Sequence, residues 1–392
     1  MLIRRSFRYR LYPNTDQQKK LAVQFGHARF VWNWGLNLRK TTYTETGKGI
    51  SYNQLAGKLV ELKNKPEAEW LKEADSQALQ QKLQDLERAY THFYEKRAKF
   101  PRFKSKRDNQ SIRYPQRFKF SDVQVYLPKV GWVKAVFHRP LEGKAKNVTV
   151  SKTKTGKYFA SIQCEVETPA ALPNNGEIGI DLGLKSFLVT SAGEKIDHPR
   201  HLQKAEKRLL RLQRQLSRRV KGSKGREKVR VLLARQHEKV ADQREDFLHK
   251  ASRSLVDRYG FIGIEDLHVR GMVKNHSLAK SISSSGWGMF RRMLDYKARW
   301  HGSWVEKIDR FYPSSKTCSA CGFVLTEMSL DLREWDCPNC GVHHDRDQNA
   351  AINILNQARA GVARRYAGGE RVSPGIQAVL VEAGSPPAFG GG

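Results

Sequence analysis

The sequence predicts a multidomain α/β protein, and three observations lead to this fold class. Apolar residues recur at helical spacing over residues 14–98, short alternating stretches typical of β-strands fill residues 121–168, and strands alternate with long helices after residue 176. The Pro- and Asn-rich stretch "TPAALPNNG" separates the second region from the third. With 392 residues, the chain is long enough for two or three domains that each bury a core.

The β-rich region is expected to form a small barrel or sheet, which the first strand of the chain is free to join. In "FRYRLYP" the apolar side chains alternate with Arg8 and Arg10, which is typical of a half-buried strand with basic residues on its open face. Further along, "KNVTVSKTKTGKYFASIQCEVE" contains a hairpin signal at Gly156.

Residues 14–98 are expected to form a small helical module. Thr15 and Gln18 have the spacing of a capping box at the start of its first helix. Leucine and aromatic side chains then repeat on one face over residues 75–98, which predicts a second helix packed against the first.

A basic segment follows this module. Residues 96–120 carry ten Lys and Arg side chains against one acidic side chain, interleaved with Phe and Tyr, and this composition suits contact with phosphates and stacking against bases. A solvated loop is the alternative for any single basic run. The whole chain has a formal net charge of +32 and a pI near 10.1, which indicates a polyanionic partner, because each neutralised phosphate releases counterions.

The charge argues less well for a membrane surface, which would attract one basic amphipathic helix rather than charge spread along the chain. Neither "MLIRRSFRYRLYPN" at the N-terminus nor any later window has the apolar run of a signal peptide or a membrane span. The protein is therefore expected in the cytoplasm.

Residues 176–360 are expected to form a mixed α/β domain. Three short strands in "EIGIDLGLKSFLVTSAGEKI" precede a basic helical hairpin at residues 200–256, and "YGFIGIEDL" and "SWVEKIDRF" are further strands on either side of an amphipathic helix. The tail, residues 361–392, is rich in Gly, Ala and Pro and is expected to be disordered.

Four of the five cysteines form two CxxC pairs that are separated by 15 residues. The pairs are Cys318 with Cys321 and Cys337 with Cys340. In a reducing compartment this spacing predicts one zinc ion held by four thiolates, in a closed site that is structural rather than catalytic. His343 and His344 are alternative ligands, but four cysteines already complete the coordination shell.

Three acids have the sequence context of a catalytic metal site. Asp181 and Glu265 each end an apolar strand, and Asp347 lies in the first turn of the helix "DQNAAINIL". Carboxylates converging from two strands and a helix start would bind two divalent cations about 4 Å apart, as in phosphodiester cleavage, and oxygen ligands select magnesium or manganese. Taken singly, an acid at a strand end more often caps a helix. Asp345, three residues before Gln348, is assigned to capping for this reason, and Asp347 to the metal.

At these residues the chain resembles the TnpB family of transposon-encoded RNA-guided nucleases, which are related to type V CRISPR effectors. The resemblance covers nearly the whole chain and is carried by "RLYP", "FPRF", "GIDLG", "GIEDL", "SSSGWG", the four-cysteine ribbon and "HDRDQNAA", in this order. Several ordered motifs at these spacings are far more specific than any one of them.

The resemblance implies an RNase H-like, RuvC-type nuclease domain over residues 176–360, which contains the helical hairpin at 200–256 and a zinc ribbon at 315–343. It implies a wedge-type β-barrel built from residues 1–13 and 99–168. It also implies that residues 14–98 are a helical recognition module inserted in this barrel.

The implied activity is guide-directed cleavage of double-stranded DNA beside a short motif that the protein reads. The implied metal ligands are Asp181, Glu265 and Asp347, which would hold two magnesium or manganese ions. The implied partners are a guide RNA from the transposon end and the target DNA, in a monomeric ribonucleoprotein in the cytoplasm of a bacterium or archaeon, near the nucleoid.

Four further residues match the positions at which the family contacts the DNA motif. They are Tyr52, Ser76, Gln77 and Gln80. A Gln can pair bidentately with adenine in the major groove, and Ser76 and Gln80 share one helix face. A plain polar surface is the alternative.

Two rival functions remain open from the sequence. A guided protein that binds DNA without cutting it would lack one of the acids, whereas all three are present here. A cut-and-paste transposase would usually order its acids Asp, Asp, Glu, whereas this chain has Asp, Glu, Asp with the cysteine pairs inside the last interval.

Overall fold

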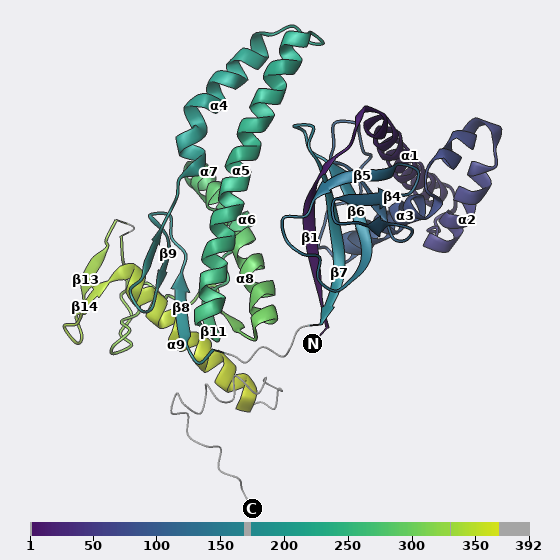
Figure 1. The fold of residues 1–392 in the computed structure, drawn as a ribbon. Helices are drawn as coiled ribbons and strands as arrows, with labels where there is room; N and C mark the ends of the chain where they lie inside the picture. Colours follow the sequence, from purple (N-terminus) through teal and green to yellow (C-terminus); the bar gives the residue numbers. More distant parts are fainter. Residues whose placement is uncertain (1, 168–173, 330, 368–392) are drawn as a thin grey trace, which may run out of the picture. The chain divides into compact units, whose positions relative to one another are not determined.

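The structure is a computed structural model, and it describes residues 2–167, 174–329 and 331–367. The chain divides into two compact units, Met1–Thr168 and Pro169–Gly392, and the division falls at the start of the Pro- and Asn-rich stretch (Figure 1). Each unit has its own sheet and its own core. No helix among the described residues is long and apolar enough to cross a membrane.

The first unit contains one antiparallel sheet with the strand order β2-β6-β7-β1-β5-β4-β3. Its strands are β1 (Leu2–Tyr12), β2 (Gln110–Tyr114), β3 (Lys119–Phe120), β4 (Gln124–Leu127), β5 (Gly131–Val136), β6 (Lys144–Lys152) and β7 (Tyr158–Glu167). The first strand of the chain does join this sheet, in a central place between β7 and β5. The expected barrel is not closed, because the outer strands β2 and β3 do not pair with each other.

The alternation in β1 is confirmed. Phe7, Tyr9 and Leu11 are buried, whereas Arg8 is exposed. The guanidinium of Arg8 lies 3.9 Å from the ring centroid of Phe159, so the basic face of this strand is partly ordered by a cation–π contact.

The helical part of the first unit packs into one apolar core. It consists of α1 (Thr15–Thr46), α2 (Tyr52–Lys63), the 3-10 helix η1 (Pro66–Glu73) and α3 (Ser76–Tyr94). A Cβ on Gly35 of α1 would lie 3.0 Å from Leu83 of α3, so a glycine at this place lets the two helices come together. The capping box of α1 is formed by Asn14 and Gln17, one residue earlier than the sequence predicts.

The second unit contains a five-stranded sheet with the order β10-β9-β8-β11-β12. Its strands are β8 (Glu177–Asp181), β9 (Ser186–Thr190), β10 (Lys195–Asp197), β11 (Phe261–Glu265) and β12 (Trp304–Ile308). The first three form an antiparallel meander, whereas β11 is parallel to both β8 and β12. The mixed α/β domain predicted from the sequence is therefore confirmed in its strands.

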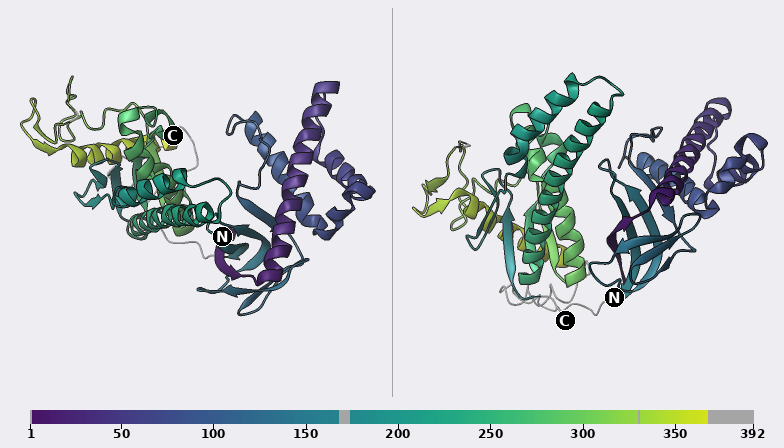
Figure 2. Two further views of the ribbon diagram at one scale, coloured as in Figure 1. Left: turned by 90° about the horizontal axis from the view of Figure 1, so that it is seen from above. Right: turned by 45° about the horizontal axis from the view of Figure 1, so that its top comes forward.

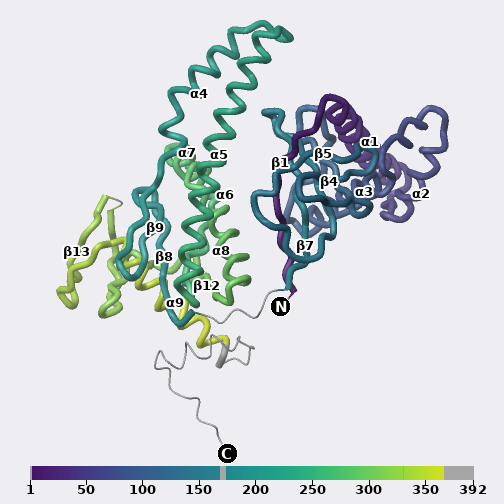
Figure 3. Tube along the Cα trace, in the orientation of Figure 1, coloured from purple at the N-terminus to yellow at the C-terminus, as the bar shows by residue number. Residues whose placement is uncertain are grey.

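Helices lie on both faces of this sheet. On one face, Ile178 and Ile264 pack against Leu248 and Leu255 of α5 (Lys224–Arg258) and against Leu294 of α8 (Trp287–His301). On the other face, Phe261 packs against residues of α9 (Arg346–Ala367). Figure 3 traces α9 running beside β8.

The remaining elements extend from this core. α4 (His201–Arg218) and α5 form the expected helical hairpin and run side by side in both views of Figure 2. α6 (Val269–Met272) and α7 (His276–Ser285) precede α8, and β13 (Glu334–Asp336) pairs with β14 (His343–Asp345) just before α9. Residues 361–367 are the last turns of α9 rather than disordered, and the remainder of the expected tail lies outside the described residues.

Candidate functional site

Two of the predicted acids end neighbouring parallel strands. In the register of β8 and β11, Ile180 lies opposite Ile264, so Asp181 and Glu265 follow at the same edge of the sheet. Successive side chains of a strand point to opposite faces. Because Ile180 and Ile264 face α5 and α8, both carboxylates point to the other face, the one that α9 covers.

The third acid reaches this edge because α9 lies unusually close to the sheet. A Cβ on Gly179 would lie 2.0 Å from the carbonyl oxygen of Ala351, and one on Gly263 would lie 3.0 Å from the Cβ of Ala358. Each glycine stands two residues before one of the strand acids and on the same face. Asp347 is one helical turn before Ala351, so it lies near the ends of both strands.

The charges of the three acids influence one another. Burial, and after it the charges of the Glu265 and Asp347 carboxylates, together raise the pKa of the Asp181 carboxyl to about 8. Burial also raises the pKa of Glu265, while a hydrogen bond from the Ser314 hydroxyl to its Oε1, 2.6 Å long, lowers it. A half-buried group of three carboxyls is costly without cations, and this cost is the physical signature of a metal or catalytic site.

The acids are more widely spaced than the ligands of a single small ion. Among the described residues, the four cysteines are the only group of three or more His, Cys, Asp or Glu side chains whose ligand atoms all lie within 4.8 Å of one another. A pair of cations about 4 Å apart spreads its ligands over a larger span. The carboxyl oxygens of Asp181, Glu265 and Asp347 have the hard donor chemistry that magnesium prefers.

Two neighbouring side chains of this site carry no sequence signal of their own. The guanidinium of Arg333 lies 3.7 Å from the carboxylate of Asp347. Ser314, which donates to Glu265, is held in turn by Asn353 of α9, whose Nδ2 donates to the Ser314 carbonyl oxygen at 2.9 Å.

Asp345 is engaged differently from Asp347, as the sequence predicts. Its Oδ1 accepts hydrogen bonds from the backbone N–H groups of Asp347 and Gln348, at 3.1 and 3.0 Å, which caps the start of α9. Its Oδ2 accepts a hydrogen bond of 2.7 Å from Lys195. Both of its oxygens therefore have partners, and the pKa of Asp345 is lowered by these bonds against the opposing effect of burial.

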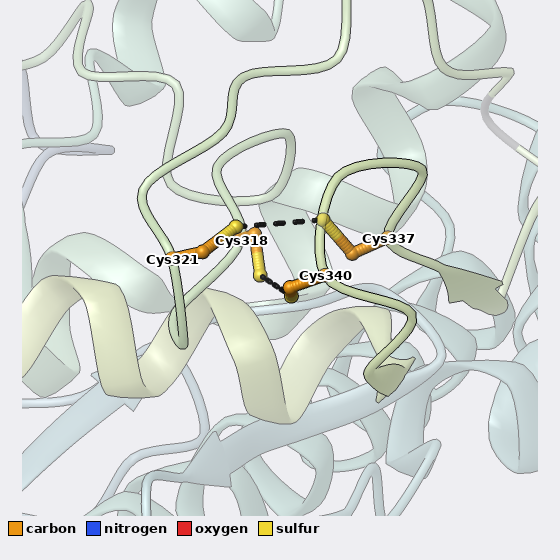
Figure 4. A group of neighbouring side chains, drawn as sticks. All are labelled: Cys318, Cys321, Cys337 and Cys340. Atoms are coloured by element: carbon orange, nitrogen blue, oxygen red, sulfur yellow. Dashed lines mark hydrogen bonds between the residues drawn. The ribbon is translucent and has the colours of Figure 1, made fainter.

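The four cysteines lie on two similar turns (Figure 4). In each turn the N–H of a glycine in the left-handed region, Gly322 or Gly341, donates to the carbonyl oxygen of the first cysteine. The sulfur–sulfur distances are 3.7 Å for Cys318 and Cys340 and 3.6 Å for Cys321 and Cys337. Four thiolates at the Zn–S distance of about 2.3 Å would lie about 3.8 Å apart in a tetrahedron, so the donor set fits zinc.

The two histidines beside the cysteines are placed differently. The Nδ1 of His343 lies 2.7 Å from Asp336, and the ring is exposed. His344 is buried, with its Nε2 3.1 Å from the sulfur of Cys318 and its ring 4.8 Å from that of Trp335. His344 thus packs against the cysteine cluster rather than adding to its four sulfurs.

Asparagines of α9 connect the cysteine turns to the acidic site. The side chain of Asn349 accepts from the N–H of Ser319 at 2.9 Å and donates to the carbonyl oxygen of Thr317 at 2.7 Å. Thr317 also accepts from Asn353. The first cysteine turn is therefore fastened to the helix that carries Asp347. Sequence reasoning missed these asparagines, since their partners are backbone groups thirty or more residues away.

The four residues matched to the DNA-contacting positions all lie in the first unit. Tyr52 begins α2, and its hydroxyl accepts a hydrogen bond from Gln84 at 3.3 Å. Ser76, Gln77 and Gln80 lie in the first turns of α3, where Ser76 is exposed and accepts from Lys63. They lie at the start of two packed helices of the first unit, whereas the cysteines and the acids belong to the second unit.

Comparison with protein families places the chain in a class of transposon-associated proteins. Residues 161–276 match the OrfB/IS605 family, described as "Probable transposase", and residues 287–354 match a Cas12f1-like TNB domain. Residues 1–48 match a family described as a helix-turn-helix domain, although the structure has one strand and one long helix there.

Relatives extend this match over nearly the whole chain. A Streptomyces pristinaespiralis protein whose name assigns it RNA-guided DNA endonuclease activity is 40% identical over 90% of this chain and 89% of its own length. InsQ of Escherichia coli K12, named in the same way, is 37% identical over 91% of this chain and 93% of its own length. This chain belongs to the TnpB family, the family that the OrfB/IS605 model represents.

A comparison with solved structures supports the same fold. The structure of Cas12f1 in complex with its single guide RNA and target DNA aligns over 91% of this chain and 99% of its own with a TM-score of 0.55. At 14% sequence identity, this likeness concerns the fold.

Proposed function

We propose that this protein is an RNA-guided DNA endonuclease of a prokaryotic transposon, which hydrolyses double-stranded DNA beside a short motif that the protein reads. The observation that carries the proposal is the convergence of Asp181, Glu265 and Asp347 at one edge of the second unit's sheet. Relatives named for this activity match 90% and 91% of the chain.

We further propose that residues 176–360 are an RNase H-like, RuvC-type nuclease domain. The support is the strand order, in which an antiparallel meander is followed by two strands parallel to its first. Under this proposal residues 1–13 and 99–168 are the wedge-type module, residues 14–98 the recognition module, and residues 315–343 the zinc ribbon.

Magnesium or manganese is the proposed cofactor at the acids, and zinc at the cysteines. Two such ions would supply a nucleophile from water and stabilise the leaving oxygen. The protein itself orients the three carboxylates that would bind these ions. Ser314 keeps Glu265 oriented through its hydrogen bond, and the pKa of Asp181 near 8 means that its proton must leave when cations bind. The cysteine turns and Asn349 hold the start of α9, and with it Asp347.

A guide RNA and the target DNA are the proposed partners, bound as a monomeric ribonucleoprotein in the cytoplasm near the nucleoid. In guided recognition base pairing reads the sequence, so the protein needs mainly a positive surface for the backbone, which a net charge of +32 supplies. We assign the motif contacts to Tyr52, Ser76, Gln77 and Gln80 at the start of α2 and α3. The hydroxyls of Tyr52 and Ser76 accept hydrogen bonds from Gln84 and Lys63, and each keeps its own O–H to donate to a base edge.

The proposal is tested by expressing the full chain together with its flanking transposon DNA and sequencing the nucleic acid that co-purifies. A single RNA that maps to the element's end, and that directs magnesium-dependent cutting of a plasmid matching its guide, is the expected result. Heterogeneous RNA that salt removes, with no guided cutting, would overturn it.

The family description "Probable transposase" keeps one second function in view. A transposase would join the cut DNA ends to a new target, so its assay yields strand-transfer products. We expect cut ends alone, since the acids follow the order Asp, Glu, Asp. A guided protein that binds without cutting would leave the plasmid intact in the same assay.

A further inference from the structure

The first unit contains a pocket of about 330 Å³ at the far ends of α1 and α3. The end of α1, the end of α3 and the start of the basic segment after α3 line it. Six of its lining residues bear on its chemistry: Arg39, Lys40, Tyr43, Tyr90, Tyr94 and Phe100. Of the assigned motif contacts, Ser76, Gln77 and Gln80 lie at the other end of α3, and Tyr52 is not among the residues that line the pocket.

Aromatic rings form the floor and rim of this pocket. Phe100 meets Tyr90 edge-on, with 5.5 Å between ring centroids and an interplanar angle of 85°. Tyr94 and Tyr43 are 72% and 63% exposed, which is high for aromatic side chains. Their uncovered ring surface suits stacking with a flat, polar-edged ring, and the polar hydroxyl of each Tyr tolerates water beside it.

The charge around the pocket is positive. None of its lining residues is acidic. The adjoining residues 96–107 contain seven Lys and Arg, of which Arg97 and Arg102 pair with the flanking acids Glu95 and Asp108, so an excess of positive charge remains. The guanidinium of Arg39 lies 4.7 Å from the Tyr90 ring centroid and forms an ion pair with Glu87. Its charge is therefore neutralised, and its contribution to the pocket is to pack against the Tyr90 ring. Lys40 and the adjoining segment supply the surplus charge, which complements phosphate groups on either side of a stacked base.

We propose that this pocket binds one unpaired nucleobase of an RNA, stacked on the exposed rings of Tyr43 and Tyr94, with the flanking phosphates on Lys40 and residues 96–107. The inference rests on the proposed function, in that the RNA is the guide. RNA is the favoured occupant because folded RNA presents unstacked loop bases, which proteins bind on aromatic faces, whereas the bases of duplex DNA are paired.

The first test measures the affinity of the full-length protein for the RNA that co-purifies with it, without DNA and at one salt concentration. Base stacking is worth about 1–3 kcal/mol, so Tyr94→Leu and Tyr43→Leu should each weaken RNA binding about 5- to 150-fold, whereas Tyr94→Phe should bind like the wild type. Trp132→Leu, which removes another exposed aromatic ring of the same unit, is the matched control and should change little.

The second test identifies the base. Single abasic substitutions are placed along the RNA, and one of them should weaken wild-type binding as much as Tyr94→Leu does, with no additional loss when the two are combined. Additive losses at every position, or unchanged RNA affinity of both Tyr variants, would overturn the inference. Weaker binding of target DNA with unchanged RNA binding would assign the pocket to DNA instead.

These outcomes are separable from a failure of the proposed function. If no specific RNA co-purifies, the proposed function fails, and the variants are compared on a short oligoadenylate, where equal affinities would also overturn the pocket's assignment. If the wild type cuts with its guide and the Tyr variants bind that guide equally well, the function stands and this inference alone falls.

Discussion

Gly179 of β8 and Ala351 of α9 approach so closely that a Cβ on the glycine would lie 2.0 Å from the carbonyl oxygen of the alanine. This contact sets the height of α9 above the sheet. Asp181 is two residues beyond Gly179 on the same face, and Asp347 is one turn before Ala351, so the contact also sets the distance between the two acids.

Gly179→Ala should therefore separate the acids. Inserting a methyl group into a packed interface costs about 1–3 kcal/mol, and here it must push α9 away from β8. We expect a lower melting temperature and a large loss of cleavage. Gly288→Ala is the matched control, because a Cβ there meets nothing within 4 Å in α8, and the substitution should stabilise the helix by up to about 1 kcal/mol. Full cleavage by Gly179→Ala would contradict the account of the site.

Asp347 and Asp345 should respond differently to substitution. Asp347→Asn should lower the cleavage rate by at least about 100-fold, the scale on which a group that stabilises a transition state acts, with RNA affinity unchanged. Asp345→Ala removes the cap of α9 and should cost about 0.5–2 kcal/mol of stability while cleavage persists. The reverse pattern, cleavage by the first variant and none by the second, would exchange the two assignments.

Asp181 predicts a pH dependence of stability without metal. Its pKa is near 8 in the folded protein and near 3.8 when unfolded, so the folded state binds more protons between these values and loses stability as the pH rises toward 8. In a chelator, the melting temperature of Asp181→Asn should exceed that of the wild type by more at pH 8 than at about pH 5.

The same pair of proteins tests metal binding. Added magnesium at pH 8 should raise the melting temperature of the wild type, because it binds only the folded state, and should raise that of Asp181→Asn less. Equal responses of the two proteins to both pH and magnesium would show that Asp181 is not a ligand.

The cysteine cluster should act through structure. Cys337→Ser should reduce bound zinc, lower the melting temperature and impair cleavage, because the thiolate turns and Asn349 hold the start of α9. Cys164→Ala, which removes the buried cysteine of β7, is the control and should leave the zinc content unchanged. If Cys337→Ser kept full zinc and full stability, the four-sulfur site would be wrong.

Local patterns predicted much of this architecture. The strands that end at Asp181 and Glu265 are where the apolar runs place them, and the cap at Asp345 follows from its spacing to Gln348. Two overlapping pairs have the spacing of a capping box, Asn14 with Gln17 and Thr15 with Gln18. The structure uses the first pair, because Asn is a stronger N-cap than Thr.

Contacts between distant segments could not be predicted in this way. Whether the outer strands β2 and β3 pair is decided by the curvature of the whole sheet, and here they do not. The bonds from Asn353 to Ser314 and from Ser314 to Glu265 join residues about forty to fifty positions apart through ordinary polar groups, which no periodicity marks. These bonds orient the Glu265 side chain. The sequence therefore predicted the positions of the acids along the chain, but not the hydrogen bonds that hold them.

The most direct measurement is cleavage of a plasmid by the purified protein, magnesium and an RNA whose guide segment has been rewritten to match a new target. We expect double-strand cuts at the new target, beside the protein-read motif, and none with Asp181→Ala, Glu265→Ala or Asp347→Ala despite normal RNA binding. Cutting that ignores the rewritten guide, or that survives the loss of these acids, would contradict the proposed function.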